Sequence, residues 1–287
     1  MPELPEVEIV KRSLAKSINK AKIVDIKIKN KNLRYVISKK IYKYLLNKQI
    51  VKISRRSKYL IFHFKSNFLL IHLGMTGKLL IMRKKDNKLF KTSFYYDLNI
   101  LKEHNHIYFK LNNGFILIYN DVRRFGFFKI YENQALKNIL FLKKLGPEPL
   151  SKNFNKIYFK KFIKKRKKGI KNLLMDQKFV SGLGNIYVNE VLHMAKIHPL
   201  RDCYNLNHLE IKKIILNVKL ILKSSISKGG STIKDFKNIA GKSGDFQQFF
   251  RVYGRENKNC SRISCKGKIK NLTIGNRSSY YCNNCQI

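Results

Sequence analysis

Tryptophan is absent from this 287-residue sequence, and proline and cysteine occur only five times each. No stretch approaches the ~18 consecutive apolar residues of a membrane-spanning helix, so we expect no membrane contact. The segment from Met1 to Glu8 is acidic and has no apolar core, which argues against a signal peptide. We therefore expect a cytoplasmic protein whose cysteines are thiols or metal ligands rather than disulfides.

Acidic residues are also scarce. The chain carries 17 Asp and Glu against 61 Lys and Arg, which gives a formal charge of +44. Such an excess favours a polyanionic partner, above all nucleic acid. A second explanation has equal weight, because abundant Lys, Ile and Asn with little Ala also reflect the codon usage of an AT-rich genome. With 44% hydrophobic residues the chain can bury a sizeable core, which excludes disorder along its whole length.

The first 131 residues predict one helix followed by a β-sandwich or barrel. Within residues 2–19, Val7, Val10 and Leu14 recur at helical spacing, which indicates a buried stripe. Short stretches rich in β-branched and aromatic residues follow, and the Asn-Asn-Gly sequence at 112–114 is typical of a hairpin. The predicted strands are 24–28, 59–64, 68–73, 107–111, 115–119 and 127–131.

The rest of the chain predicts helices and a cysteine-containing tail. Glycine and proline break both patterns near residues 145–150, so we expect a linker at 132–150. A helical domain is predicted at 151–240, and Asn207 with Glu210 resembles a capping box. Residues 241–287 begin with a glycine-rich loop. The fold class is therefore α+β with two domains, and the predicted helices are 156–168, 171–178, 185–196 and 207–228.

Four cysteines near the C-terminus have a spacing typical of a zinc site. Two close pairs joined by a hairpin can bring four thiolates onto one tetrahedral zinc ion, whose filled coordination makes it structural. Free or redox-active thiols are the alternative. Cys203 stands apart and is expected to be inert, while the basic hairpin with Arg277 suits phosphate contact or is simply solvated. The predicted ligands are Cys260, Cys265, Cys282 and Cys285.

The opening Pro2-Glu3 has two explanations. Proline is favoured in the first turn of a helix, and acidic residues there complement the helix dipole. The alternative is chemical. Removal of Met1 would leave a secondary amine on Pro2, and an α-amine titrates near pH ~7.7–8.0 and so is partly neutral in the cell. A neutral amine can attack a sugar C1′, and Glu3 could move protons beside it.

A series of motifs, in order along the chain, resembles bacterial formamidopyrimidine-DNA glycosylase. The matches extend from residue 2 to residue 285, so the resemblance covers essentially the whole chain. They are Met1–Glu8, Tyr119–Gly126, Met175–Lys178, Gly182–Tyr187, Phe246–Gln247, Val252–Arg255 and the final cysteines. The resemblance implies a helix-two-turn-helix element followed by a zinc-ribbon hairpin.

This resemblance implies a monomeric base-excision repair enzyme that acts on double-stranded DNA. Such an enzyme removes oxidised purines (8-oxoguanine and formamidopyrimidines) through a Schiff base on the N-terminal proline, and then cuts the strand by β,δ-elimination with no cofactor beyond one structural zinc ion. The implied catalytic residues are Pro2, Glu3, Lys58 and Arg277. The implied DNA contacts are His72, Met75, Arg123, Arg124, Phe125, Lys171 and Asn185.

Among these contacts, the resemblance implies that Met75, Arg123 and Phe125 enter the base stack when the lesion is extruded. Extrusion is needed because the chemistry cannot reach a base inside the duplex. The glycine-rich stretch at 240–246 would close over the flipped base. Arg277 would hold the phosphates beside the lesion.

The sequence departs from the family pattern at two places. The first cysteine pair is C-x4-C where the family usually has C-x2-C, and Val122 replaces a common proline, which loosens that loop. Two rival functions remain. The endonuclease VIII branch acts on oxidised pyrimidines, although Leu4 is typical of the purine branch. A binding protein without activity would be expected to lack Pro2, Glu3 or Lys58, and all three are present.

Overall fold

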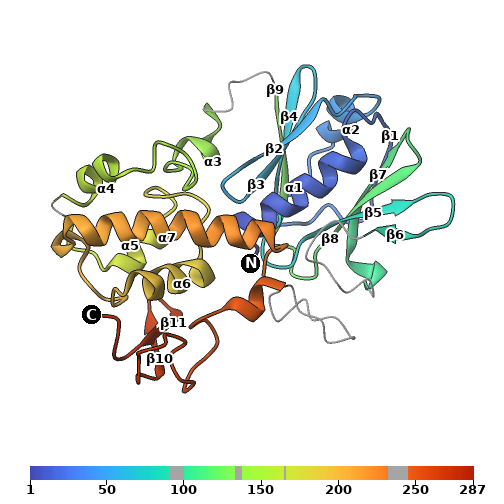
Figure 1. The fold of residues 1–287 in the computed structure, drawn as a ribbon. Helices are drawn as coiled ribbons and strands as arrows, with labels where there is room; N and C mark the ends of the chain where they lie inside the picture. The colour runs from blue at the N-terminus through green and yellow to red at the C-terminus, as the bar shows by residue number, and fades with distance from the viewer. Residues whose placement is uncertain (91–99, 133–137, 165, 232–244) are drawn as a thin grey trace. The chain divides into compact units, whose positions relative to one another are not determined.

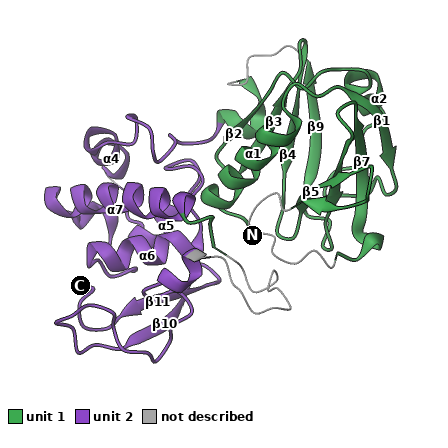
Figure 2. Ribbon diagram, turned by 45° about the vertical axis from the view of Figure 1, so that its right-hand side comes forward, with its two compact units in different colours: residues 1–143, 228–245 green, residues 144–227, 246–287 purple. Residues whose placement is uncertain are grey.

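The computed structural model describes residues 1–90, 100–132, 138–164, 166–231 and 245–287. The chain forms two compact units (Figure 2). One comprises residues 1–143 and 228–245, and the other comprises residues 144–227 and 246–287. The sequence predicted one continuous helical domain at 151–240. Residues 228–231 instead belong to the N-terminal unit, because Ser231 hydrogen-bonds to Glu6 there. The expected glycine-rich loop at 240–244 lies outside the described residues.

The first unit is a β-sandwich with two antiparallel sheets (Figure 1). One sheet has the order β1-β7-β8-β5-β6 and the other has the order β2-β3-β4-β9. Apolar side chains from both sheets and from the first helix form one core. The first sheet comprises β1 (Ile23–Ile28), β7 (Asn105–Leu111), β8 (Phe115–Asn120), β5 (Lys78–Arg83) and β6 (Leu89–Phe90). The second comprises β2 (Lys52–Arg56), β3 (Tyr59–His63), β4 (Asn67–His72) and β9 (Phe127–Glu132).

Helix α1 (Leu4–Ile18) confirms the predicted amphipathic helix. Val10, Leu14 and Ile18 are fully buried, as the stripe requires. The helix begins two residues later than predicted because Glu3 has an extended backbone and serves as the N-cap. The six predicted strands correspond to β1, β3, β4, β7, β8 and β9. Sequence reasoning missed α2 (Lys40–Leu45), α3 (Leu140–Lys143), β2, β5 and β6.

The second unit contains four helices that the sequence predicted and a two-stranded ribbon. They are α4 (Lys156–Ile163), α5 (Ile170–Met175), α6 (Asn185–Ala195) and α7 (His208–Ser227), followed by β10 (Ile269–Ile274) and β11 (Arg277–Cys282). The expected cap of α7 is confirmed, since Asn207 Oδ1 accepts two backbone N–H bonds and Glu210 accepts the N–H of Asn207. None of the described helices is long and apolar enough to cross a membrane.

Candidate functional site

The N-terminal end of α1 is held by one buried carboxylate. Glu6 Oε2 accepts the backbone N–H of Glu3 at 2.9 Å. Its other oxygen accepts both the backbone N–H and the hydroxyl of Ser231, each at 2.9 Å. Gly230 has a φ of +81°, which favours glycine, and a Cβ there would lie 3.0 Å from Ile9 and 3.2 Å from Glu6, so these side chains would have to shift. Pro2 and Glu3 are therefore buried in a fixed position that depends on a segment more than 200 residues later.

Lys58 lies in the tight turn between β2 and β3, which Ser57 makes with a left-handed φ of +55°. The turn is tied to α1 through Arg55, which donates to Glu8 at 2.9 Å and to the carbonyl of Ser57 at 2.8 Å. Burial raises the pKa of Glu8, but hydrogen bonds from Arg55 and Arg12 outweigh burial and hold it below its usual range. The ion pair therefore positions the buried Lys58 relative to the helix that carries Glu3.

His72, at the end of β4, is a neutral hydrogen-bond donor. Burial, followed by the charges of Lys58 and Arg34, lowers its pKa to about 4. Its Nδ1 lies 3.0 Å from the backbone nitrogen of Gly74 and accepts that N–H. The proton of the neutral ring is then on Nε2, where it can be donated to an anion. The ring stacks on Phe127 with centroids 5.5 Å apart, which fixes its direction.

Two loops that carry Met75, Arg123 and Phe125 are joined by the carboxylate of Asp121, which is fully buried. One oxygen accepts the Thr76 hydroxyl at 2.5 Å, and the other accepts the Tyr119 hydroxyl and the Gly126 N–H at 2.9 Å each. The Thr76 hydroxyl oxygen in turn accepts the backbone N–H of Arg123 at 3.1 Å.

The side chains on these loops face solvent. Met75 is half-buried, whereas Arg123, Arg124 and Phe125 are exposed, and the Arg123 guanidinium lies 4.7 Å from the centre of the Phe125 ring. A Cβ on Gly126 would lie 1.7 Å from the Tyr119 hydroxyl, so only glycine allows this close approach. Apolar and guanidinium groups on such a rigid base are suited to entering a DNA base stack.

In the second unit, the turn before α6 is held by the side chain of Gln177. Its oxygen accepts the N–H of Gly182 at 2.7 Å, and its amide nitrogen donates to the carbonyl of Leu183 at 2.8 Å. Gly182 has a φ of +92°, which favours glycine. Asn185 therefore begins α6 in a fixed orientation, at the helix end where backbone N–H groups favour anions.

Three predicted residues that are far apart in the sequence meet at the ribbon. Lys171 Nζ and Asn185 Nδ2 both donate to the carbonyl of Ser278, at 3.1 and 2.9 Å, and Lys171 also donates to the Ser279 hydroxyl. Arg277 is the neighbouring residue and is exposed. Burial, with a contribution from Arg277, lowers the pKa of Lys171 to about 8. Lys171 thus supports the hairpin from within, since it is 1% exposed.

The hairpin turn itself has two residues, Gly275 and Asn276, with φ values of +56° and +58°. Positive φ at both central positions is the requirement of a type I′ turn, which matches the twist of the two strands. Arg277 follows directly and pairs with Ile274, so its backbone is fixed by the ribbon.

The four predicted metal ligands converge. All four sulfur atoms lie within 4.8 Å of one another, with Cys260–Cys285 at 3.9 Å and Cys265–Cys282 at 3.5 Å. A tetrahedral zinc with Zn–S bonds of ~2.3 Å would separate its sulfurs by ~3.8 Å, so the cluster has the right size. A backbone hydrogen bond from Gly267 lowers the pKa of Cys265 to about 7, and burial raises that of Cys285 to about 12. The cluster therefore holds protons at neutral pH that a metal ion would displace.

Sequence reasoning missed two carboxylates that organise these parts. Asp121 lies inside a motif that was recognised, but its role as a link between loops depends on Thr76, 45 residues earlier. Glu190 is buried and accepts the backbone N–H bonds of residues 251–253 at 2.9 to 3.0 Å. Burial raises its pKa, although these bonds oppose the rise. Nothing in the local sequence of α6 indicates that Glu190 holds the backbone of residues 251–253.

Two family profiles match this chain. Residues 1–128 match the formamidopyrimidine-DNA glycosylase N-terminal domain, and residues 145–237 match the formamidopyrimidine-DNA glycosylase H2TH domain. A formamidopyrimidine-DNA glycosylase of Zymomonas mobilis is 38% identical over the full length of both chains. The chain belongs to the formamidopyrimidine-DNA glycosylase family. It is therefore a DNA repair glycosylase, as the sequence predicted, and the expected fold class is confirmed.

Solved structures of family members have the same fold as this chain. A Lactococcus lactis enzyme in complex with DNA that contains an abasic site has a TM-score of 0.85 at 34% identity, with 99% of each chain covered. A point mutant of that enzyme, bound to DNA that contains Fapy-dG, has a TM-score of 0.84 at 35% identity, with 98% of each chain covered.

Proposed function

We propose that this glycosylase removes oxidised purines from double-stranded DNA and then cleaves the strand at the resulting abasic site. The Lactococcus lactis relative binds DNA with Fapy-dG and DNA with an abasic site, which correspond to the substrate of the first step and to the product of base removal. The observation that carries the proposal is the buried, fixed Pro2-Glu3 pair at the start of α1. A nucleophile and a proton carrier must be held in one position to act on the same sugar.

Pro2 is the proposed nucleophile. Removal of Met1 would free its secondary amine, which titrates near pH ~7.7–8.0 and is therefore partly neutral at physiological pH. The amine attacks C1′ of the damaged nucleotide and loses its proton as the C1′–N bond to the base breaks. Protonation of O4′ then opens the sugar ring, and a tertiary iminium cation remains between Pro2 and C1′. Glu3 is the proposed proton carrier, and Glu6 acts through Glu3 and Ser231 as a positioning residue.

The iminium then acidifies the C2′ proton. Loss of this proton expels the 3′ phosphate by β-elimination, and a second elimination expels the 5′ phosphate. Lys58 is proposed to contact backbone phosphate and to assist these steps. His72 and Arg124 are proposed phosphate contacts, and the neutral His72 ring supports this role because it offers an N–H without the cost of burying a charge.

Met75, Arg123 and Phe125 are proposed to fill the space left by the extruded nucleotide and to contact the unpaired base. The exposure of Arg123 and Phe125 and the anchoring of both loops on Asp121 support this role. Wedges that enter a base stack must be held rigidly, since unstacking costs a few kcal/mol per step.

Arg277 and Asn185 are proposed to hold phosphates beside the lesion. The hydrogen bond from Asn185 to the carbonyl of Ser278 supports the assignment, since it joins the first residue of α6 to the residue after the exposed Arg277. We propose Lys171 as the positioning residue of the hairpin.

The four cysteines are proposed to bind one structural zinc ion. Sulfur is the donor that structural zinc prefers, and the sulfur spacing fits tetrahedral coordination despite the longer C-x4-C segment. The ion would hold the base of the ribbon, which carries Arg277 at its other end.

Borohydride trapping tests the proposal. The full-length protein is mixed with a duplex that carries 8-oxoguanine opposite cytosine, and borohydride reduces any iminium to a stable cross-link. We expect a cross-link that depends on the damage and whose peptide maps to Pro2. The Pro2→Gly variant and undamaged DNA serve as controls.

Two results would change the conclusion. The lyase mechanism would be refuted if the protein binds DNA and its intact mass shows that Met1 is removed, but no cross-link forms. A cross-link with thymine glycol but not with 8-oxoguanine would move the substrate to oxidised pyrimidines.

A further inference from the structure

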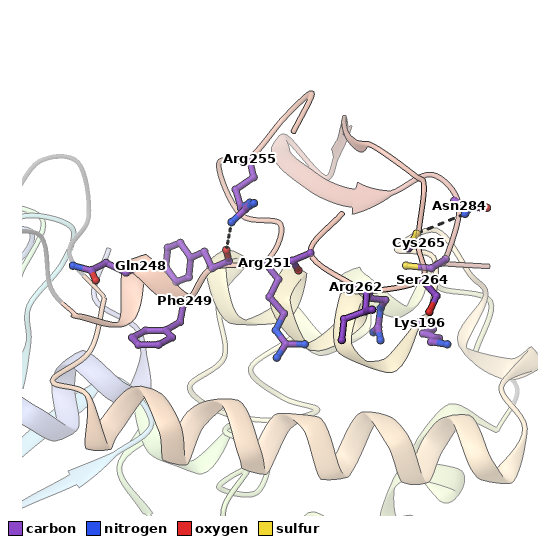
Figure 3. Close-up of a pocket in the computed structure, with 13 residues that line it drawn as sticks. Lys196, Gln248, Phe249, Arg251, Arg255, Arg262, Ser264, Cys265 and Asn284 are labelled. Atoms are coloured by element: carbon purple, nitrogen blue, oxygen red, sulfur yellow. Dashed lines mark hydrogen bonds between the residues drawn. The ribbon is translucent and has the colours of Figure 1, made fainter. Parts of the chain in front are cut away.

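A groove of about 790 Å³ lies in the second unit, between residues 248–255 and the first cysteine pair (Figure 3). Its basic lining residues are Lys196, Arg251, Arg255 and Arg262, and no Asp or Glu lines it. Figure 3 shows Gln248 and Phe249 at one end, Lys196, Cys265 and Asn284 at the other, and Arg251 and Arg262 between them. The volume is within the usual range of small-molecule sites.

These four cations lack ion-pair partners among the described residues. In the described part of the chain, no carboxylate forms an ion pair with any of the four. The buried Glu190 interacts electrostatically with Arg251, but its two oxygens accept three backbone N–H groups. A zinc ion with four thiolates would carry a charge of −2, and an ionised Glu190 would add −1. Against four cations, the groove keeps an excess of about one positive charge with Glu190 ionised and about two with Glu190 protonated.

Two of the guanidinium groups are anchored by backbone carbonyls. Arg262, inside the lengthened C-x4-C segment, donates to the carbonyls of His193 and Met194 at 2.6 and 3.1 Å. Arg255 donates to the carbonyl of Phe250 at 3.2 Å. Each anchor uses a single terminal nitrogen, so the other terminal nitrogen is available for an anion. Anchored guanidiniums of this kind are well suited to phosphate, which they bind at little cost in side-chain entropy.

The groove is separate from the place where Arg277 lies. Arg277 and Cys282 are the two ends of β11, so about five residues at ~3.3 Å each, or ~17 Å, separate them. The cysteine end of the ribbon borders the groove, and the Arg277 end does not. A phosphate in the groove would therefore be distinct from those assigned to Arg277.

We propose that this groove binds a phosphate ester, either in a nucleic-acid strand or in a free nucleotide. The three guanidiniums and Lys196 would hold the phosphate. Phe249 at the far end stacks on Phe246 with centroids 6.5 Å apart and is 50% exposed, so a base can contact its exposed part.

Amide chemical shifts of the full-length, metal-loaded protein test the site. Inorganic phosphate is titrated to ~10 mM, which is tenfold above a Kd of ~1 mM. We expect saturable shifts in residues 248–251 and 261–265. An undamaged single-stranded octanucleotide should shift the same amides and also Phe249, whereas a mononucleotide that matches its effect would identify the free nucleotide as the ligand.

The variant Lys196→Gln/Arg251→Gln removes two charges without touching the anchored Arg262. It should weaken phosphate binding about tenfold and lower the salt dependence of octanucleotide binding by roughly 0.7 per contact removed. Lys258→Gln is the matched control, because Lys258 is exposed on the same unit and does not line the groove.

Absence of shifts in the wild-type protein with phosphate and with both nucleotides would overturn the proposal, as would equal binding by the double variant. If the wild-type protein shows no shifts and the double variant loses zinc, these cations serve the metal cluster instead.

Discussion

Replacing Asp121 by asparagine is expected to slow base removal much more than cleavage at a preformed abasic site. The change keeps the size of the side chain but turns one acceptor oxygen into an NH2 group. If the NH2 group faces Gly126, its backbone N–H loses its acceptor, and if the NH2 group faces Thr76, the Thr76 hydroxyl loses its acceptor. In either orientation one buried donor is left without an acceptor.

The size of the effect follows from that count. An unsatisfied buried donor costs ~1–3 kcal/mol. About 2 kcal/mol would shift the equilibrium between the anchored and released loops by roughly 30-fold. Under the proposed roles, Met75, Arg123 and Phe125 act during extrusion of the base. The single-turnover rate of 8-oxoguanine removal should therefore fall by up to ~30-fold.

The assay compares two substrates under single-turnover conditions. Strand cleavage of a duplex with a preformed abasic site should change less than about threefold, because no base has to be extruded. Asp25→Asn is the matched control, since Asp25 is an exposed partner of Lys110 at 2.7 Å on β1. Equal losses on both substrates, or no loss on either, would refute the link between Asp121 and extrusion.

Three further outcomes are expected. Cys265→Ser should lower the zinc content below stoichiometric and weaken binding to abasic-site DNA, as metal analysis and fluorescence anisotropy would show; a full zinc complement would contradict the ligand assignment. Lys171→Met should weaken that binding roughly tenfold, since two hydrogen bonds to the hairpin beside Arg277 are lost; unchanged affinity would remove its positioning role. Burial, followed by the charge of Lys52, lowers the pKa of His63 to about 4. The unfolded chain takes up this proton near pH ~6.5 and the folded one only near 4, so stability is lost as pH falls through this window, by at most ~3 kcal/mol. Urea midpoints at pH 7 and pH 4.5 should therefore differ less for His63→Gln than for the wild type, and equal differences would count against the buried neutral ring.

Elements with a clear period were predictable from the sequence, and short or charged elements were not. Helix α1 has a regular apolar stripe, and α7 has a cap that the sequence displays. Strand β2 has three basic residues and only one apolar residue, Ile53, and it is a strand because it pairs with β3 over its whole length. Helix α2 has only six residues, too few for a helical period to appear.

Site residues with a clear spacing in the sequence were likewise predictable, and those whose role depends on distant residues were not. The cysteine spacing predicted a cluster that the fold assembles. Lys171 could not be distinguished among 61 basic residues by its surroundings in the sequence, because its burial depends on Ser278 and Ser279, over 100 positions later. In the sequence Glu6 is an ordinary acidic residue in the first turn of a helix, and its role becomes visible only through the hydrogen bond from Ser231.

The link between Glu6 and Ser231 also bears on how the protein is made. A ribosome adds roughly 5–20 residues per second, so Ser231 is synthesised ~10–45 seconds after Glu6. Until then the carboxylate at the start of α1 lacks both hydrogen bonds from Ser231. A chain that ends after residue 143 would lack these two bonds, which help to fix the start of α1. The proposed position of Pro2 and Glu3 is thus completed only after Ser231 has been synthesised.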